Sequence, residues 1–283
     1  MRETDFKKKT DERIMQLKAG SVPLLYFPLL QQIPFVGHGF TTREGGVSEG
    51  MFSSLNLSFT RGDRREAVEE NFKRLAAALG VSYGDFVFSD QTHTTNILRV
   101  GKEHRGCGLT KERGYSDIDG LITNEPNVAL STFYADCVPL FFVDPVHHAI
   151  GLSHSGWRGT AGRMGAATLS AMNREFGTLP EEVFAAIGPS ICQDCYEVSG
   201  DAAEVFQKEF PAYQNAVLKP HGAGKYLLDL WKCNEIVLLE AGVCRVHLAA
   251  ANICTCCNPK LLFSHRASHG KRGNLGAFLF LKD

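Results

Sequence analysis

The sequence lacks several features that would mark whole classes of protein. No apolar run reaches the roughly 20 residues that a membrane-spanning helix needs. The net charge is −1, so no basic surface for nucleic acid or anionic lipid is expected. The N-terminal stretch MRETDFKKKTDERIMQLKAG has no apolar core of the signal-peptide type. We therefore expect a cytoplasmic protein that binds neither nucleic acid nor membranes.

What the sequence does contain is nine cysteines. In a cytoplasmic protein these are expected to be reduced thiols or metal ligands rather than disulfides. The 283 residues, with 44% apolar and 22% charged content, suit a globular protein of one large domain or two small ones. Residues 1–22 are rich in charge and form a predicted N-terminal arm, and residues 23–283 form the body of the protein.

The stretch STFYADCVPLFFVDPVHHAIGLSHSGWRGT holds the strongest local signal. Two apolar runs, 138–143 and 149–152, predict neighbouring buried strands. Asp144-Pro145 between them favours a turn. Because a hairpin brings its two ends together, Cys137 before the first run and His154 after the second are predicted to converge. A thiolate and an imidazole would then share one end of a sheet.

A third donor is His93, which ends the segment SDQTH after an apolar run. One Cys with two His is a known three-ligand set for zinc that leaves a fourth position open for water or substrate. On the other interpretation His93 is an ordinary residue beside a strand. With ten His and nine Cys in the chain, many such triples could be selected, so spacing alone does not decide.

A Gly-rich turn, TTREGGVS, follows another predicted strand. Arg43 stands at the junction, Gly45-Gly46 lets the backbone approach a ligand closely, and Ser48 follows. A guanidinium with free N–H groups suits phosphate, which makes this turn a candidate anion site with a catalytic Arg43 and with Gly46 and Ser48 as contacts. The alternative is a plain turn with a solvated arginine.

Three more residues are candidates for the site, and two of them, Asp119 and Arg158, carry two interpretations each. Asp119 in DIDG either binds its own backbone in a turn or lies near the metal, as a partner of a ligand or as a substrate contact. Arg158 in SGWRG precedes a predicted helix, where it could meet an anion or pair with a carboxylate. Arg266 in LFSHR could face the same site.

Four cysteines form two C-x-x-C pairs, Cys192/Cys195 and Cys254/Cys257. Two such pairs are a Cys₄ zinc pattern in principle. The 58 residues between them far exceed the usual spacing of a zinc knuckle, which weakens the signal. A non-enzymatic metal or thiol protein built on this half of the chain is therefore one of the functions to be tested.

Helix signals are clear in two places. Asp63 can cap a helix, Glu66 stands at the capping-box distance, and Gly80 ends the helix. A second helix is predicted over residues 160–176.

Taken together, the segments HGFTTREGGVS, SLNL, DQTH, DIDG, ADCVPLFFVD, SHSGWRGT, IGPSICQDCYEV and LFSHR resemble the laccase-domain family, once called multicopper polyphenol oxidases. The resemblance runs from about residue 33 to the C-terminus. Members are also described as purine nucleoside phosphorylases and, in some bacteria, as peptidoglycan editing factor. ADCVP with HSGWRGT is specific as a pair.

The resemblance implies a fold and a reaction. The family fold is α/β (α+β), a single compact catalytic domain with stacked mixed β-sheets flanked by helices. The implied metal ligands are His93, Cys137 and His154, with Cys137 and His154 also catalytic, and the implied cofactor is Zn²⁺, with Cu²⁺ as a substitute in vitro. The implied reactions are phosphorolysis of adenosine, inosine, guanosine and methylthioadenosine, and hydrolytic deamination of adenosine. The partners would be purine nucleosides and phosphate, with the chain as a monomer or homodimer.

Two other functions stay open. Cys137 could be the nucleophile and His154 the base of an amide hydrolase acting on peptidoglycan precursors. The family's older name implies a copper-dependent polyphenol oxidase, which we disfavour because the sequence has no His-x-His pair of the kind that multicopper sites use.

Overall fold

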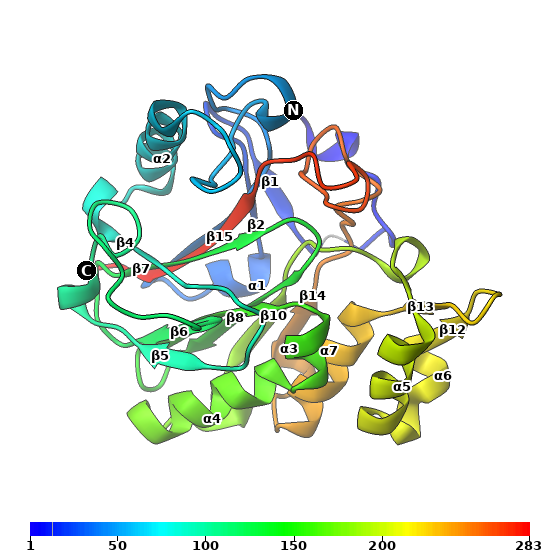
Figure 1. Cartoon of the computed structure of the whole chain (residues 1–283). Helices are drawn as coiled ribbons and strands as arrows, with labels where there is room; N and C mark the ends of the chain where they lie inside the picture. Colours follow the sequence, from blue (N-terminus) through cyan, green and yellow to red (C-terminus); the bar gives the residue numbers. More distant parts are fainter. Residues whose placement is uncertain (13) are drawn as a thin grey trace.

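Two six-stranded β-sheets lie face to face in the computed structural model, and a three-stranded sheet stands at one side (Figure 1). The structure describes residues 1–12 and 14–283, so Arg13 of the predicted arm lies outside the described residues. Helices cover the outer faces of the two large sheets, as the predicted α/β fold with stacked mixed sheets requires. This part of the prediction is confirmed.

The first sheet has the strand order β1-β2-β3-β15-β7-β4. Its strands pair antiparallel except β4, which pairs parallel with β7. Its members are β1 Gln16–Lys18, β2 Leu24–Tyr26, β3 Val36–Thr41, β4 Phe86–Phe88, β7 Ala129–Tyr134 and β15 Leu275–Leu281.

The second sheet has the order β14-β10-β8-β9-β6-β5, with parallel pairs at both edges. Its members are β5 Ile97–Arg99, β6 Gly120–Thr123, β8 Val138–Asp144, β9 Ala149–Ser155, β10 Phe184–Ile187 and β14 Leu248–Ala250. The predicted hairpin is confirmed as its two central strands, β8 and β9. Every residue of both strands is buried. This explains why the sequence shows continuous apolar runs here and no alternation of apolar and polar residues.

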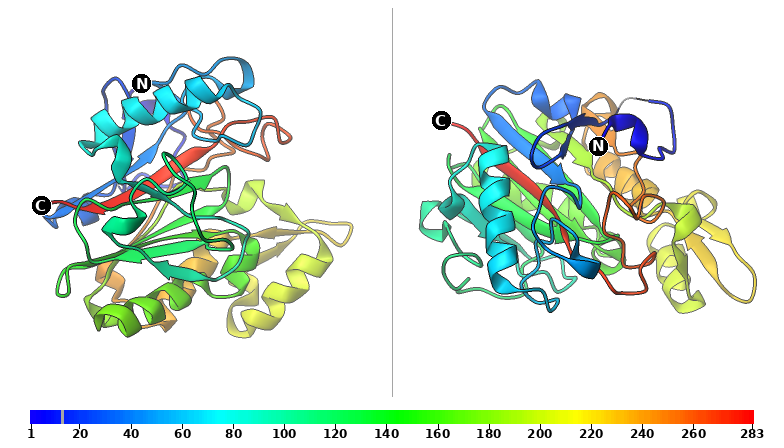
Figure 2. Two further views of the ribbon diagram at one scale, coloured as in Figure 1. Left: turned by 60° about the vertical axis from the view of Figure 1, so that its left-hand side comes forward. Right: turned by 90° about the horizontal axis from the view of Figure 1, so that it is seen from above.

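Helices complete the layers. Helix α2 covers the outer face of the first sheet, and helices α4 and α7 cover the outer face of the second (Figures 1 and 2). Their buried side chains belong to the hydrophobic clusters on those two faces. Next to α5 and α6 stands the small sheet, formed by β11 Glu197–Val198, β12 Leu218–Pro220 and β13 Tyr226–Leu228. The helices are α1 Pro28–Gln31, α2 Arg65–Leu79, α3 Trp157–Ala161, α4 Met164–Phe176, α5 Gly200–Glu209, α6 Gln214–Val217 and α7 Leu230–Glu240. Within the described ranges, no helix is both long and apolar enough to cross a membrane.

Two helix predictions need correction. The capping prediction for Asp63 is wrong, because helix α2 has Arg64 at its N-cap, while the Asp63 carboxylate accepts hydrogen bonds from Asn56 and from the Arg64 N–H. The C-terminal signal is confirmed, since Gly80 adopts φ 75° and ends the helix. The helix predicted over residues 160–176 is two helices, α3 and α4, separated where Arg163 takes φ 61°.

The N-terminal residues contact the rest of the protein at several points. Phe6 and Met15 are buried in the main hydrophobic core between the sheets. Lys8 forms a β-bridge with Ile253, and Figure 2 shows the first residues, in dark blue, beside the orange segment near the other end of the chain. The charged segment 1–22 is therefore packed against the domain at these positions.

Candidate metal centre

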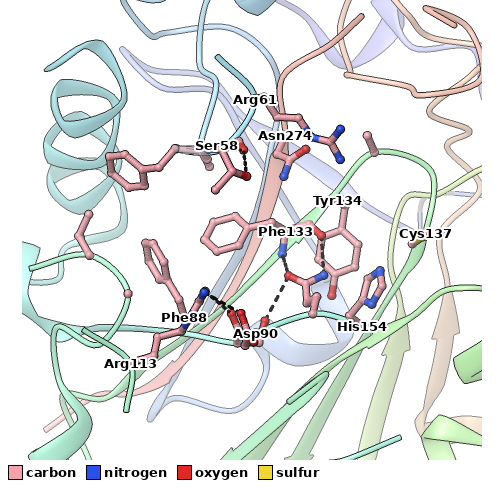
Figure 3. Close-up of a pocket in the computed structure, with 18 of the residues that line it drawn as sticks. Ser58, Arg61, Phe88, Asp90, Arg113, Phe133, Tyr134, Cys137, His154 and Asn274 are labelled. Atoms are coloured by element: carbon pink, nitrogen blue, oxygen red, sulfur yellow. Dashed lines mark hydrogen bonds and ion pairs between the residues drawn. The ribbon is translucent and has the colours of Figure 1, made fainter. Parts of the chain in front are cut away.

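Three side chains of types that can bind a metal, from separate parts of the sequence, meet at one end of the second sheet. Cys137 directly precedes β8, His154 lies in β9, and His93 stands between β4 and β5. Their donor atoms lie within 4.8 Å of one another. The structure thus brings together the three residues that the sequence singled out, and Figure 3 shows Cys137 and His154 beside a cavity.

The register of the hairpin sets this meeting. Val138 pairs with Ser155 and Pro139 pairs with His154, so Cys137 stands one position beyond the last strand pair. The two donors are 17 positions apart in sequence but neighbours at the end of the hairpin. The predicted convergence of Cys137 and His154 follows from this register.

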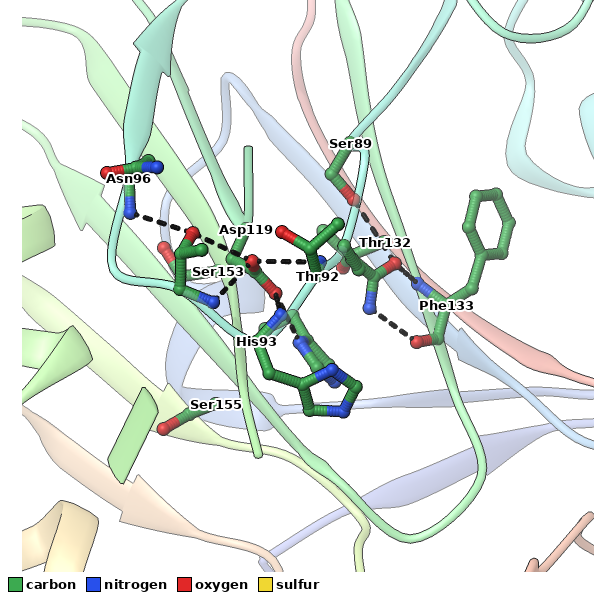
Figure 4. A network of polar contacts seen from close by, with 12 residues as sticks. Ser89, Thr92, His93, Asn96, Asp119, Thr132, Phe133, Ser153 and Ser155 are labelled. Atoms are coloured by element: carbon green, nitrogen blue, oxygen red, sulfur yellow. Dashed lines mark hydrogen bonds and ion pairs between the residues drawn. The ribbon is translucent and has the colours of Figure 1, made fainter. Parts of the chain in front are cut away.

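Asp119 holds both imidazole-bearing segments in place (Figure 4). Its Oδ1 lies 2.7 Å from Nδ1 of His154 and accepts the backbone N–H of His93 at 3.1 Å. Its Oδ2 accepts the N–H groups of Thr92 and Thr94 at 3.1 and 2.8 Å. These bonds stabilise a loop in which His93 adopts φ 69°. Since Nδ1 of His154 faces the carboxylate, Nε2 is the nitrogen left to face the centre.

The charges of this group depend on one another. Burial disfavours ionised Asp119, but the hydrogen bonds from His154 and from Thr94 outweigh it and lower its pKa to about 2. Burial also raises the pKa of Cys137, yet the adjacent His154 and His93 bring it down to about 6. Burial lowers the pKa of His154, while Cys137 and Asp119 raise it to about 9. Near pH 7 and without metal, these opposite shifts favour a Cys137 thiolate beside a protonated His154.

A cavity of about 760 Å³ opens beside the three donors. His154 is buried, Cys137 is half-buried and His93 is exposed, so the centre is covered on one side and open on the cavity side. The polar lining residues include Ser58, Arg61, Arg65, Arg113, Arg272 and Asn274. None of these six was singled out by the sequence, because they lie in loops or on an exposed helix turn and carry no motif spacing.

Arg272 is the most unusual of these residues. It is 8% exposed, and its Nε has no hydrogen-bond partner among the described residues. Burial, and then the positive charge of Arg61, lowers the pKa of its guanidinium to about 10. A buried cation with a second cation nearby and an unused donor is an arrangement that an anion would stabilise.

The Gly-rich turn around Arg43 does not line the cavity beside the three donors. Arg43 donates from Nε to the carbonyl of Ser53 at 2.7 Å and from Nη1 to that of Pro259 at 2.8 Å. A Cβ added at Gly46 would come within 2.1 Å of the Ser54 carbonyl oxygen, so this glycine serves a close backbone approach. The Ser48 hydroxyl accepts from Asn71 at 2.9 Å. Arg43, Gly46 and Ser48 do not line the cavity beside the three donors.

The other two predicted arginines also lie outside the cavity lining. Arg158 is exposed and its guanidinium lies 4.4 Å from the ring centroid of Trp157. Arg266 donates to the carbonyls of Cys195 and Glu197 at 3.3 and 2.9 Å. Its guanidinium is thus used within the fold.

Fold and centre together define an α/β protein of stacked mixed sheets with a Cys-His₂ donor set beside a polar cavity. The chain matches the family described as multi-copper polyphenol oxidoreductase laccase over residues 37–282, and it belongs to that family.

Two activities occur in the names of similar proteins, purine nucleoside phosphorylase and adenosine deaminase. The chain is 34% identical over 246 residues to purine nucleoside phosphorylase YlmD of Bacillus subtilis (strain 168), covering 87% of this chain and 88% of that protein. It is 33% identical over 229 residues to adenosine deaminase RL5 of an unknown prokaryotic organism, covering 80% and 87%. The crystal structure of YlmD from Geobacillus stearothermophilus has a TM-score of 0.89 at 34% identity, covering 95% of this chain and 99% of that one.

Proposed function

We propose that this chain is a zinc-dependent enzyme of purine nucleosides. The proposed reactions are phosphorolysis of adenosine, inosine, guanosine and methylthioadenosine, and hydrolytic deamination of adenosine. The observation that carries the proposal is the Cys-His₂ set of His93, Cys137 and His154 at the edge of a 760 Å³ cavity whose lining includes several cations. The names of the relatives, a purine nucleoside phosphorylase and an adenosine deaminase, supply the substrate class.

The donor set fits zinc. One thiolate and two imidazoles suit this metal, and three protein ligands leave one position for water or substrate, whereas Mg²⁺ and Ca²⁺ prefer oxygen ligands. The three donor atoms are close enough to share one ion. When bound, zinc supplies Lewis acidity that lowers the pKa of a water molecule toward neutrality.

The chain's own residues prepare both reactions. Asp119 fixes the ring of His154 through Nδ1 and the loop that carries His93, so the ligands are pre-positioned before substrate binds. In phosphorolysis, an oxygen of phosphate bonds to C1′ of the ribose while the C–N bond to the purine breaks. The purine leaves with the electron pair of that bond and takes up a proton, which balances the one that phosphate loses. Arg61 and Arg272 are the cavity cations that we assign to the phosphate. They replace Arg43 in this role, because Arg43 is not among the lining residues and its guanidinium donates to the Ser53 and Pro259 carbonyls.

The purine has an aromatic wall to contact. Phe88 and Phe133 line the cavity with ring centroids 4.7 Å apart in an edge-to-face pair. Two hydrogen bonds from the Gln91 side chain hold the backbone of Phe133. Its Nε2 donates to the Phe133 carbonyl at 2.8 Å, and its Oε1 accepts the Phe133 N–H at 2.7 Å. A fixed aromatic surface suits stacking of a planar base.

A cysteine hydrolase is the second candidate, favoured by the order Asp119, His154, Cys137. In metal-free protein the carboxylate orients the imidazole, and the pKa of the thiol is about 6, as a nucleophilic cysteine needs. This function needs no zinc. Phenol oxidation is not proposed, because a multicopper oxidase needs several histidine-rich sites, and among the described residues one candidate group combines two histidines.

The test is a paired assay of wild type and Cys137→Ala after metal removal and zinc reconstitution. Adenosine is incubated with and without phosphate, products are separated by chromatography, and zinc is counted by mass spectrometry. Cys244→Ser, which removes a half-buried thiol outside the donor set, is the matched control. Adenine release that requires phosphate, with loss of one zinc per chain in Cys137→Ala, supports the proposal. Turnover by zinc-free wild type that is lost in Cys137→Ala would contradict zinc dependence and point to Cys137 as a nucleophile.

A further inference from the structure

Four cysteines, two of them buried, meet in a part of the fold that does not line the cavity beside His93, Cys137 and His154. Cys192 and Cys195 bracket a short turn after β10, and Cys254 and Cys257 bracket another after β14. Their sulfurs lie within 4.8 Å of one another, with 3.5 Å from Cys195 to Cys257 and 4.0 Å from Cys192 to Cys257.

The topology explains how pairs 58 residues apart become neighbours. Strands β10 and β14 are parallel and adjacent, with Ile187 paired to Ala250. Parallel neighbours end at the same edge of a sheet, so the segments that follow them emerge side by side. A parallel bridge between Ser190 and Cys254 continues the pairing up to the cysteines. The long sequence gap is thus no obstacle to a shared site.

The sulfur spacing is that of metal ligands. Zinc–sulfur bonds of about 2.3 Å in a tetrahedron place the sulfurs about 3.8 Å apart. A disulfide requires about 2 Å between sulfurs, so the arrangement with all four sulfurs in one group matches coordination better than a pair of disulfides.

The backbone donates to the sulfur that is most deeply buried. Cys254 is fully buried, and its Sγ accepts the N–H of Cys192 at 3.2 Å and the N–H of Cys257 at 3.4 Å. N–H groups aimed at sulfur stabilise a thiolate, the form that binds metal. Lys9 adds positive charge nearby, held by an ion pair of 2.9 Å with Asp194 inside the first turn.

We propose that Cys192, Cys195, Cys254 and Cys257 bind one structural Zn²⁺. All four ligands come from the protein, so the site is closed and differs from the His93-Cys137-His154 centre, which leaves a position open. The proposal concerns a second ion and does not depend on which substrate the first centre acts on.

This zinc would act on the purine site through Asp136, the residue before Cys137. The Asp136 carbonyl accepts the N–H of Ile191 at 3.0 Å, and its Oδ1 accepts the hydroxyl of Thr255 at 2.6 Å. Ile191 directly precedes Cys192, Thr255 lies between Cys254 and Cys257, and Asp136 itself adopts φ 94°. Joining the turns through one ion therefore fixes the backbone that presents Cys137.

It would also fasten the N-terminal residues. Asn258, which follows Cys257, accepts the N–H of Lys7 at 2.7 Å through Oδ1 and donates to the Lys7 carbonyl at 3.1 Å. Loss of the ion should loosen this contact together with the turn.

Zinc counting with single substitutions tests the proposal. We expect two zinc ions per chain in wild type, one in Cys257→Ser, and one in Cys137→Ala, since each variant removes a ligand of a different group. Cys256→Ser is the matched control, because Cys256 lies between two of the ligands but outside the group, and it should keep both ions. Two zinc ions in Cys257→Ser, as in wild type, would overturn the assignment. So would the loss of one zinc ion in Cys256→Ser while Cys257→Ser keeps both.

A second measurement does not require the cluster to survive mutation. Zinc K-edge absorption of Cys137→Ala should show four sulfur ligands, and its cobalt-substituted form should show the intense visible bands of a tetrahedral tetrathiolate. Iron in place of zinc would overturn the proposal. So would metal-free protein whose mass shows loss of two hydrogens per cysteine pair, which would indicate disulfides.

Discussion

Oδ1 of Asp119 and Nδ1 of His154 lie 2.7 Å apart, and the backbone N–H of His154 also donates to the Asp119 carbonyl at 2.7 Å. One residue thus fixes both the ring and the main chain of a proposed zinc ligand. The same carboxylate accepts N–H groups from the loop that carries His93. Asp119 is not one of the three clustered donors; its part is to hold His93 and His154, two of the proposed zinc ligands, in position.

Asp119→Asn should weaken zinc binding by His93, Cys137 and His154. The amide has nearly the same shape but carries no charge and has one acceptor oxygen in place of two. Replacing such a partner typically costs about 10- to 100-fold in metal affinity. We expect that loss in a chelator competition assay. Asp117→Asn, an exposed aspartate in the same DID segment, is the control and should bind zinc as wild type does. Equal affinity in Asp119→Asn would show that the contact is not needed.

Two candidate phosphate sites can be separated by kinetics. Arg61→Gln removes a cation from the cavity, and we expect the KM for phosphate to rise by roughly 10- to 100-fold, the range for a lost charge-assisted hydrogen bond of about 1.5–3 kcal/mol. Adenosine deamination, which uses no phosphate, should change little.

Arg43→Gln is the matched comparison. It removes hydrogen bonds to Ser53 and Pro259 and should lower the melting temperature while leaving the KM for phosphate near its wild-type value. The reverse result, with a raised KM in Arg43→Gln alone, would return the phosphate to the Gly-rich turn.

The contrast between these arginines shows what a sequence can and cannot indicate. The β8–β9 hairpin was predictable because its buried runs and its Asp-Pro turn are local signals, and the convergence of Cys137 and His154 follows from the hairpin. Arg61 and Arg272 carry no local signal, since they reach the cavity only after distant loops pack together. The glycines beside Arg43 were predicted to let the backbone approach a ligand. In the structure, Gly46 instead lets the backbone pass close to the Ser54 carbonyl. Close approach to a ligand and to backbone require the same residue type.

The cysteine pairs give a second example. A 58-residue gap weakened the Cys₄ pattern, and only the parallel pairing of β10 with β14 shows that the gap is bridged. His93 was a weak candidate by spacing and gained support from the family resemblance. Its place in the structure depends on hydrogen bonds to Asp119, 26 positions away, which no periodicity reveals.

Cys137 should be reactive in metal-free protein at mildly acidic pH. Its pKa of about 6 means that the thiolate is present above pH 6 and is lost below it, whereas an ordinary thiol ionises near 9. We expect the rate of iodoacetamide labelling at Cys137, followed by peptide mass spectrometry, to have its midpoint near pH 6 after chelation. Zinc should suppress labelling, because the thiolate is then a ligand. A midpoint near 9 would mean that His154 does not stabilise the thiolate.

His38 should make the folded protein sensitive to acid. It is 2% exposed, and its Nε2 accepts the N–H of Phe27 at 2.9 Å, which requires the neutral ring. Burial, and then the charge of Lys282, lowers the pKa of His38 to about 3, against 6.5 in the unfolded chain. Above pH 6.5 both states are neutral at this residue and its contribution to stability is full. As the pH falls from 6.5 toward 3, His38 binds a proton in the unfolded state but not in the folded state. The free energy of unfolding therefore falls by about 1.4 kcal/mol per pH unit.

His38→Gln removes this titration and keeps an acceptor for the Phe27 N–H. Between about pH 7.5 and about pH 5, wild type should lose about 2 kcal/mol more unfolding free energy than the variant, because the unfolded histidine becomes protonated over most of that interval. Urea unfolding at the two pH values measures both losses. His221→Gln, at an exposed histidine, should lose as much as wild type. If His38→Gln and wild type lose the same free energy, the His38 ring is protonated in the folded protein and its hydrogen bond to Phe27 does not survive in acid.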